Sequence, residues 1–335
     1  MTVIFLALLL FAQATPSKVD THAAIERFKQ EIASTPNDPT PYVGLGQAYL
    51  QASKYAEAIP ALTHALELKP DLPGVHRMLG YALLAQGYAA EAVPHFDLVQ
   101  DHAALGIAQI EMNHFSEAVT NLQTALLEKP NDPDLIYYLG RASQMLANEC
   151  NERLLTQFPE SGRAHQLKAE NYSTFHEISK AEGEFRAALA ARPDLPGVHL
   201  ELGELYAQSS RFSEAEQEFR KERQDRPGSA EGAYRLGQIL LQEGKAQEAV
   251  HELKESNDLM PNMPETLQSL GKAALLSEDK ALAEKSWIQL LSIEKEGRLA
   301  TQAHFDLATL YRSEGKRQEA ETHMQLFQKA RRATQ

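Results

Sequence analysis

Histidine and its acidic neighbours are the residues most able to do catalytic chemistry in this chain of 335 residues, which contains 12 histidines. His176 and His251 are each followed by glutamate, as in zinc-protease helices. Lys180 and Glu255 stand where the second zinc-binding histidine would be required. The Gly-Lys pair at 271–272 continues with alanine, unlike a phosphate-binding loop, and no Gly-x-Ser-x-Gly motif occurs. A hydrolase is therefore a minor alternative.

The other histidines have simpler explanations. One local group mixes histidine with aspartate, and there we favour a solvated surface over a metal site: His95, Asp97, Asp101, His102 and His114. Four more occupy equivalent positions of a repeated pattern and are expected to pack between helices: His76, His165, His199 and His304. The single cysteine, Cys150, excludes an internal disulfide and a cysteine-based zinc site. We expect no metal, no other cofactor and no enzymatic activity.

A repeated sequence pattern indicates which elements position these side chains. Small residues, usually preceded by leucine, recur as anchors at Gly46, Gly80, Gly106, Gly140, Ala169, Gly203, Gly237, Gly271 and Ala308. Five of the eight intervals between successive anchors are 34 residues. Alanine follows most anchors by twelve residues, and a large apolar residue usually stands four residues further on. The pattern predicts a series of similar structural units.

Each unit has the spacing of two helices. In the first unit the apolar stripe of the first helix comprises Tyr42, Leu45, Gly46 and Tyr49, and that of the second comprises Ala58, Leu62 and Ala65. Small residues where two helices cross let the helix axes approach closely. Prolines end second helices and begin the next first helices, as Pro70 and Pro73 do.

This multi-position pattern resembles the tetratricopeptide repeat. The resemblance covers roughly residues 39–334 as about nine units, and residues 15–38 form an N-terminal segment with a degenerate half-repeat. It implies an all-α fold, a right-handed superhelical solenoid of antiparallel helix pairs. Such solenoids have a concave groove in which other proteins bind.

Two units depart from the usual length. Gly80 and Gly106 are 26 residues apart, and Gly140 and Ala169 are 29 residues apart. We expect shortened units near 90–105 and 145–161. In the first, the second helix should be shorter. In the second, the turn between Met145 and Glu149 should be tighter.

The groove should be lined by positions 2, 5, 9 and 12 of each first helix. At about 100° per residue these positions lie roughly 140° from the buried stripe, and the family resemblance implies the same. They mix aromatic, aliphatic and charged residues, which is typical of a protein recognition surface. The predicted partner-binding residues are Arg77, Tyr81, Ile107, Tyr137, Arg141, Arg163, Glu170, Leu200, Glu204, Tyr234, Gln238 and Phe305.

These groove positions are expected to differ in exposure. Aliphatic residues at position 12 should pack beneath the neighbouring unit, namely Leu50, Leu84, Ile110 and Leu241. Tyrosines at positions 5 and 9 should be exposed, namely Tyr81, Tyr137 and Tyr234. Three early arginines, Arg77, Arg141 and Arg163, favour a partner segment that has apolar side chains and an acidic group. Later units present glutamates instead, namely Glu170, Glu204, Glu231 and Glu265.

The amino-terminal residues have the pattern of a signal peptide at 1–14. An apolar run from Val3 to Ala12 is followed by the small-x-small sequence Ala12-Gln13-Ala14. Ten apolar residues are about half of the ~20 that a spanning helix needs, so we expect no membrane insertion after cleavage. We therefore expect an exported protein, periplasmic or extracellular.

Composition restricts the partners. A net charge of −13 and a pI near 5.4 disfavour nucleic acid and anionic membranes. The favoured function is a non-catalytic scaffold that binds a protein or peptide in its groove. The alternative is a carbohydrate-binding or envelope-polysaccharide export or assembly accessory protein, in which the same aromatic residues stack on sugars.

Overall fold

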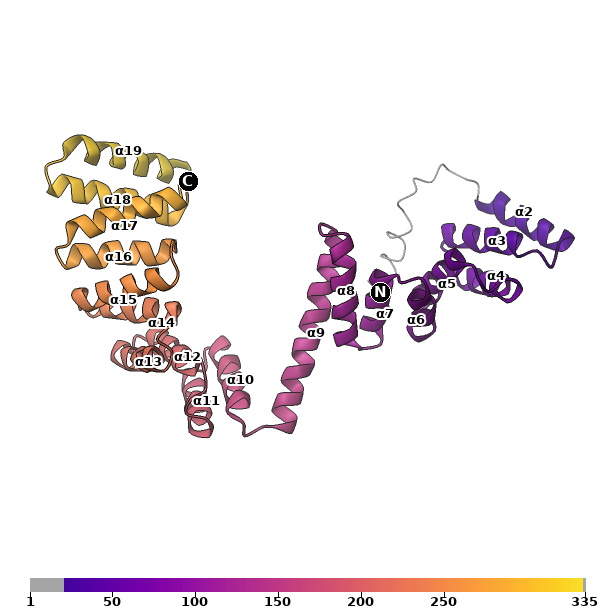
Figure 1. The fold of residues 1–335 in the computed structure, drawn as a ribbon, viewed down its shortest axis with the longest axis horizontal. Helices are drawn as coiled ribbons and strands as arrows, with labels where there is room; N and C mark the ends of the chain where they lie inside the picture. Colours follow the sequence, from indigo (N-terminus) through magenta and orange to yellow (C-terminus); the bar gives the residue numbers. More distant parts are fainter. Residues whose placement is uncertain (1–20, 334–335) are drawn as a thin grey trace. The chain divides into compact units, whose positions relative to one another are not determined.

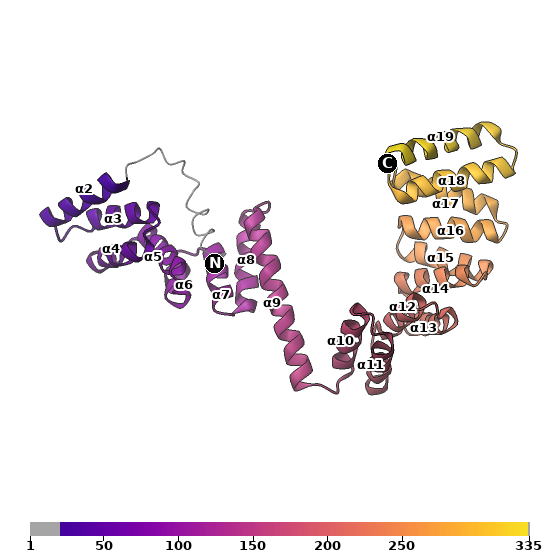
Figure 2. The same ribbon diagram turned by 180° about the vertical axis from the view of Figure 1, so that it is seen from behind.

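The computed structural model describes residues 21–333, which form 18 helices, α2 to α19, and no strand (Figures 1 and 2). The predicted all-α repeat solenoid is confirmed. The predicted signal peptide lies outside the described residues. Among the described helices, none combines the length and the apolar character that crossing a membrane requires.

The chain divides into two compact units, Met1–Glu152 and Arg153–Gln335. The described helices that lie wholly in the first unit are α2 (Thr21–Ser34), α3 (Pro39–Gln51), α4 (Tyr55–Leu68), α5 (Pro73–Ala85), α6 (Ala89–Leu98), α7 (His102–Glu111) and α8 (Phe115–Glu128). Helix α9 (Pro133–Gln157) begins in the first unit and ends in the second.

The second unit contains ten further helices. They are α10 (Gly162–Thr174), α11 (Ile178–Ala191), α12 (Val198–Gln208), α13 (Phe212–Asp225), α14 (Ala230–Gln242), α15 (Ala246–Leu259), α16 (Pro264–Leu276), α17 (Lys280–Ile293), α18 (Arg298–Ser313) and α19 (Arg317–Ala333).

Within each unit, helices pack as successive pairs. Each pair joins a first helix to the second helix that follows it, as α5 to α6 or α14 to α15, and the second helix also contacts the next first helix. Apolar side chains buried between them form a core that runs along the row of helices rather than around one centre. This is the packing of a repeat solenoid.

The anchor glycines explain how closely each pair packs. A side-chain carbon added at Gly203 would lie 2.6 Å from the ring of Phe219, and one added at Gly237 would lie 2.6 Å from Leu253. Phe219 and Leu253 belong to the second helix of the same pair and are almost completely buried. The pair can approach to this distance only because the anchor has no side chain.

A three-residue turn joins the helices of each regular pair, as residues 52–54 join α3 to α4. One turn residue has a positive φ, and it always stands seven residues after the anchor: Ser53, Gly87, Asn113, His176, Ser210, Gly244, Glu278 and Gly315. Most are glycine or small polar residues, which adopt this conformation at little cost.

Helix α9 departs from this plan. It runs for 25 residues without interruption, so the predicted tightened turn between Met145 and Glu149 was wrong. In a regular unit the first helix ends five residues after its anchor, at Gln51 for Gly46, and the turn occupies three residues. The fourth tetratricopeptide-like repeat, with anchor Gly140, is five residues short. No residues remain for a turn, so its two helices are continuous.

Candidate functional site

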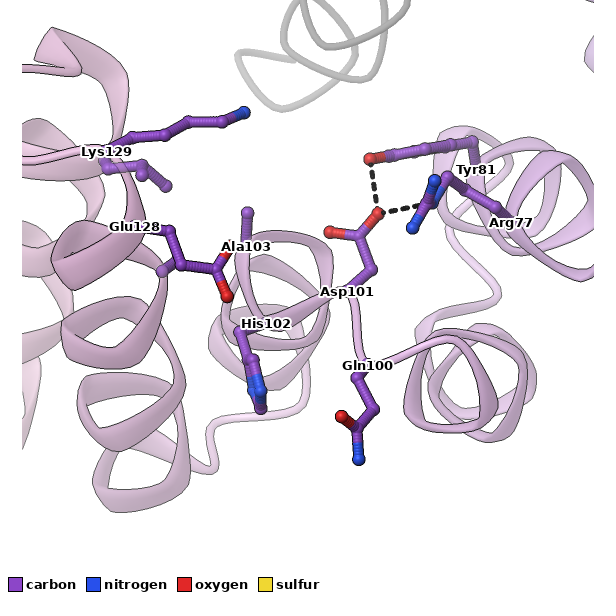
Figure 3. A pocket seen from close by; sticks show the side chains of 10 residues that line it. Arg77, Tyr81, Gln100, Asp101, His102, Ala103, Glu128 and Lys129 are labelled. Atoms are coloured by element: carbon purple, nitrogen blue, oxygen red, sulfur yellow. Dashed lines mark hydrogen bonds and ion pairs between the residues drawn. The ribbon is translucent and has the colours of Figure 1, made fainter. Parts of the chain in front are cut away.

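A cavity of about 440 Å³ opens in the first unit among α5, α7 and α8 (Figure 3). We call it the early cavity. Its lining residues come from α5, from the α6–α7 connection, from α7, from the end of α8 and from the start of α9: Arg77, Tyr81, Gln100, Asp101, His102, Ala103, Ala125, Glu128, Lys129 and Leu135. Two of them, Arg77 and Tyr81, are predicted site residues.

Asp101 fixes one wall of the early cavity. Its Oδ1 accepts a hydrogen bond from the backbone N–H of Ala104 at 3.2 Å, which caps the amino terminus of α7. Its Oδ2 accepts from the Tyr81 hydroxyl at 3.0 Å and lies 3.1 Å from Arg77 Nε. Burial, followed by the nearby Asp101 carboxylate, raises the pKa of Tyr81 well above its ordinary value, so the hydroxyl remains a donor.

The shortened repeat that contains α6 brings Asp101 close to Arg77 and Tyr81. Helix α6 has 10 residues, whereas α4 has 14. The chain then turns through Gln100, whose φ is 51°, and Asp101 becomes the residue that caps α7. Capping by aspartate places its carboxylate beside the backbone N–H groups of the next helix. The same carboxylate is then within reach of α5.

Charged side chains stand on opposite sides of the early cavity. Figure 3 shows Arg77 and Tyr81 approaching Asp101 from one side, and Lys129 extending over the open space from the other. The Arg77 side chain is 50% exposed. Within residues 21–333, neither Glu128 nor Lys129 forms an ion pair, and both are exposed. These charges can therefore meet a partner.

A second cluster lies in the second unit on α10, α12 and α14. Gln166 Nε2 donates to Glu201 Oε1 at 2.8 Å. Burial, followed by the nearby Glu170 carboxylate, raises the pKa of Glu201 to about 7. Glu204 lies 3.0 Å from Arg235 Nε, and burial raises the pKa of Glu204.

The predicted glutamates Glu170 and Glu204 thus share one acidic region of the second unit, which Glu201 completes. Arg163 hydrogen-bonds to Gln166 within the same region. This region contains more carboxylates than cations, so it favours cationic side chains of a partner.

The exposure predictions succeed in part. Tyr137 is 57% exposed, as predicted, and Phe305 is 40% exposed. The predicted exposure of Tyr81 and Tyr234 was wrong, because these side chains are 6% and 9% exposed. Ile107, another predicted groove residue, is 4% exposed.

Packing against neighbouring side chains explains the buried rings. Tyr81 packs edge-on against Phe96 with 5.1 Å between ring centroids, and the Tyr234 hydroxyl accepts a hydrogen bond from Gln238 Nε2 at 2.6 Å. Leu50, Leu84 and Ile110 are buried as predicted. Leu241 and Leu200 are partly buried against the core of the second unit, and Arg141 is partly exposed.

The repeated histidines join the two helices of a unit, so the packing prediction for them is confirmed. His76 Nδ1 lies 2.9 Å from His95 Nδ1, and His304 Nδ1 lies 2.9 Å from His323 Nδ1. His165 and His199 instead hydrogen-bond at 2.6 Å to Glu184 and Glu218 of the second helices. These contacts hold first and second helices in register.

The local group of histidines does not assemble into a site. His95 pairs with His76, whereas His102 Nδ1 lies 2.8 Å from Asn121 Oδ1. In the part of the chain that is described, the one group of three possible metal ligands is His251, Glu252 and Glu255. Arg223 already pairs with both glutamates, at 3.2 Å and 2.6 Å. A cation there would have to displace the guanidinium.

The chain is an all-α repeat protein, because its helices stack as successive similar pairs. The family model of the tetratricopeptide repeat matches residues 20–73, 43–105, 167–230 and 200–256, which together exceed half of the chain. The chain belongs to the tetratricopeptide repeat family. None of the curated proteins compared with it matches.

Solved structures with similar folds include MamA from Desulfovibrio magneticus RS-1, which is 16% identical, with 51% of this chain and 96% of that chain covered and a TM-score of 0.49. PilF from Pseudomonas aeruginosa is 19% identical, with 68% and 89% covered and a TM-score of 0.44. Yeast Tom70 is 12% identical, with 98% and 90% covered and a TM-score of 0.42.

Several residues of the two surfaces escaped sequence prediction. Asp101 was assigned to a solvated group, and Glu128, Lys129 and Glu201 were not singled out. The available signal for Asp101 was its place directly before the short first helix that contains Gly106, at the end of the 26-residue interval. An aspartate there is well suited to cap a helix.

Proposed function

We propose that this protein is a non-catalytic scaffold that binds a polypeptide partner, and that the early cavity receives part of that partner. The observation that carries the proposal is the fixed wall of Arg77, Tyr81 and Asp101, which faces Lys129 across about 440 Å³ of open space. Membership of the tetratricopeptide repeat family supports a binding function.

The chemistry of the early cavity suits a segment with an acidic group. Among the described residues, Asp101 engages Arg77 through its Nε, so the two terminal guanidinium nitrogens can donate to a carboxylate of the partner. Lys129 supplies a second positive charge. Because the wall is already held by hydrogen bonds, little side-chain ordering is needed on association.

Glu128 and Asp101 limit what can bind. Their carboxylates would repel a densely acidic ligand such as a polyphosphate, so a peptide with one acidic group among polar or apolar side chains fits better. The acidic region around Glu201 and Glu204 would receive cationic side chains of the same or another partner.

Site-specific photo-crosslinking tests this proposal. A photoreactive amino acid at Ala103, inside the early cavity, should capture a partner in extract from the native source. The same substitution at Thr120, an exposed residue of α8 that does not line the cavity, should not capture it. Capture at Ala103 should also fall when Lys129 is changed to glutamate. Identical capture from Ala103 and Thr120 would contradict the proposal.

We also propose that the protein acts outside the cytoplasm, after cleavage following residue 14. The support is the apolar run and the small-x-small sequence near the amino terminus. Amino-terminal sequencing of the mature protein should begin at Thr15. An intact amino terminus on the protein recovered from cells would contradict cleavage.

The carbohydrate alternative loses two of the aromatic residues that were predicted to stack on sugars. Sugar stacking requires exposed ring faces, and the rings of Tyr81 and Tyr234 are buried. Tyr137 and Phe305 are exposed.

A further inference from the structure

Among the described residues, no helix packs against the face of α9 that carries Gly140. Gly140 is the anchor of the fourth unit, and a side-chain carbon added there would meet no atom within 4 Å. At six other anchors such a carbon would lie within 3 Å of a leucine, phenylalanine or tryptophan of the second helix: Gly46, Gly80, Gly106, Gly203, Gly237 and Gly271. Within residues 21–333, no second helix covers Gly140 as it covers the other anchor glycines.

Other residues of the same face are exposed too. Ile136 stands four residues before its anchor, the position at which His76 and His199 contact their second helices. Ile136 is 52% exposed, and the neighbouring Tyr137 is 57% exposed. Ser143, one turn beyond Gly140, is also exposed. This face of the first half of α9 therefore has the residues that contact a second helix in regular pairs, but among the described residues no helix covers it.

The second half of α9 has the sequence pattern of the missing second helix. In regular units the repeated spacing places alanine 22 residues before the next anchor. It places the residue that covers the preceding anchor 18 residues before it. Ala215 and Phe219 precede Gly237 in this way, and Phe219 covers Gly203. Counting back from Ala169 gives Ala147 and Asn151. Both are exposed, whereas Ala215 and Phe219 are buried.

The chain cannot place this segment on its own Gly140 as regular units do. Counted from Gly140, the first helix should end at residue 145. Counted back from Ala169, the second helix should start at residue 144. No residue is left for the turn. The turn residue seven positions after the anchor would be Ala147, which is helical here and would resist a positive φ.

We propose that a second copy of this chain supplies the missing helix. Two α9 helices pair antiparallel, so that the first half of α9 in each copy packs against residues 147–158 of the other copy. Exchange of identical elements is a low-cost route to a dimer, and removal of a hinge loop favours it. The contact is isologous, because each copy offers the same face and the same segment.

The register follows from the regular helix pairs. Gly140 of one copy faces Asn151 of the other, and Ser143 faces Ala147. Ile136 lies beside Cys150, because the residue four before an anchor contacts the residue fifteen after it, as His76 contacts His95. Small residues at the centre allow close approach of the two helices. Apolar residues at both ends, including the 56% exposed Phe158, bury surface on pairing.

Charge also favours the antiparallel arrangement. In this register Arg141 of one copy lies within about one helical turn of Glu149 of the other, and the symmetry repeats the contact. Within residues 21–333 neither Arg141 nor Glu149 forms an ion pair inside the chain. A parallel arrangement would place each residue beside its own copy and bring like charges together.

Analytical ultracentrifugation of the whole protein tests the proposal. The wild type should show a concentration-dependent equilibrium between monomer and dimer. Gly140→Leu should raise the dissociation constant at least tenfold, because it fills the notch that Asn151 enters. Gly183→Leu is the matched control, since Gly183 also lies inside a helix with no atom within 4 Å. It should leave the equilibrium unchanged.

Two further variants keep the test decisive. In a Cys150→Ser background, copies carrying Ser143→Cys should form disulfides with tagged copies carrying Ala147→Cys. A five-residue insertion after Met145 that includes the Gln86–Tyr88 turn sequence should restore the regular pair and yield a monomer. A wild type that is monomeric at all concentrations, or equal dimerisation of Gly140→Leu and wild type, would overturn the proposal.

Discussion

At the scale of single residues, Asp101 links local structure to the early cavity. One carboxylate oxygen caps α7, and the other holds Tyr81 and Arg77 of α5. Because a single side chain serves the helix terminus and the cavity wall, its contacts should affect both stability and recognition.

Changing Tyr81 to phenylalanine tests that link. The substitution keeps the ring packed on Phe96 and removes the hydroxyl that donates to Asp101. We expect the free energy of unfolding in urea to fall by about 1 kcal/mol, the usual effect of one hydrogen bond. Tyr88→Phe is the control because Tyr88 is 52% exposed. Equal stability of wild type and Tyr81→Phe would show that the hydrogen bond contributes nothing.

The raised pKa of Glu201 predicts a pH dependence. Its folded-state pKa is about 7, above the ordinary value of 4.5. The folded state therefore binds this proton more tightly than the unfolded state. The resulting stabilisation is complete below pH 4.5 and is lost as the pH rises through 7.

We expect Glu201→Gln to remove this loss. Relative to the wild type, the variant should gain stability between pH 5 and pH 8, by an amount on the order of 1 kcal/mol once solvent screening at this partly exposed group is allowed for. Thermal unfolding at several pH values measures the difference, with the exposed Glu57→Gln as control. Parallel stability profiles for Glu201→Gln and wild type would contradict the assignment.

At the scale of helices, spacing predicted most of the fold. Anchor positions located the helix pairs, and the small residues at those anchors indicated close packing, which the structure shows at Gly203. The exposure of aromatic side chains was harder to predict. Position 9 lies on the face predicted to line the groove, but Tyr81 is long enough to reach Asp101 in the following connection and becomes buried.

The prediction of a turn in the fourth repeat was wrong for a different reason. Sequence similarity located Gly140 and Ala169, but similarity alone does not show whether enough residues remain for a turn. Counting from both anchors leaves none, and the run from Met145 to Glu149 consists mainly of good helix formers. A continuous helix is the consequence.

Two equivalent glycines should respond oppositely to alanine. Gly203→Ala places a carbon 2.6 Å from the almost fully buried Phe219, so we expect a loss of about 1–3 kcal/mol in the free energy of unfolding. In the monomer, at protein concentrations below the dissociation constant of the proposed dimer, Gly140→Ala meets no atom within 4 Å and should stabilise α9 by up to about 1 kcal/mol. Denaturant unfolding compares the two. Similar destabilisation of the monomer by both would mean that Gly140 is covered within its own chain like the other anchors.

At the scale of the whole molecule, the chain is a tetratricopeptide repeat protein whose described residues divide into two compact units. The first contains the early cavity with Arg77 and Lys129, and the second contains the acidic region around Glu201. Different charges in the two units are consistent with a scaffold that distinguishes between partner segments.

The affinity of the partner captured from Ala103 tests the central claim most directly. Isothermal titration should compare the wild type, the double variant Arg77→Glu/Lys129→Glu, and the control Lys254→Glu, whose lysine is exposed on α15. We predict at least about tenfold weaker binding for the double variant alone, with unchanged helical content, because two charges at the cavity are reversed. Equal affinity for the double variant and the wild type would contradict the claim that the early cavity binds the partner.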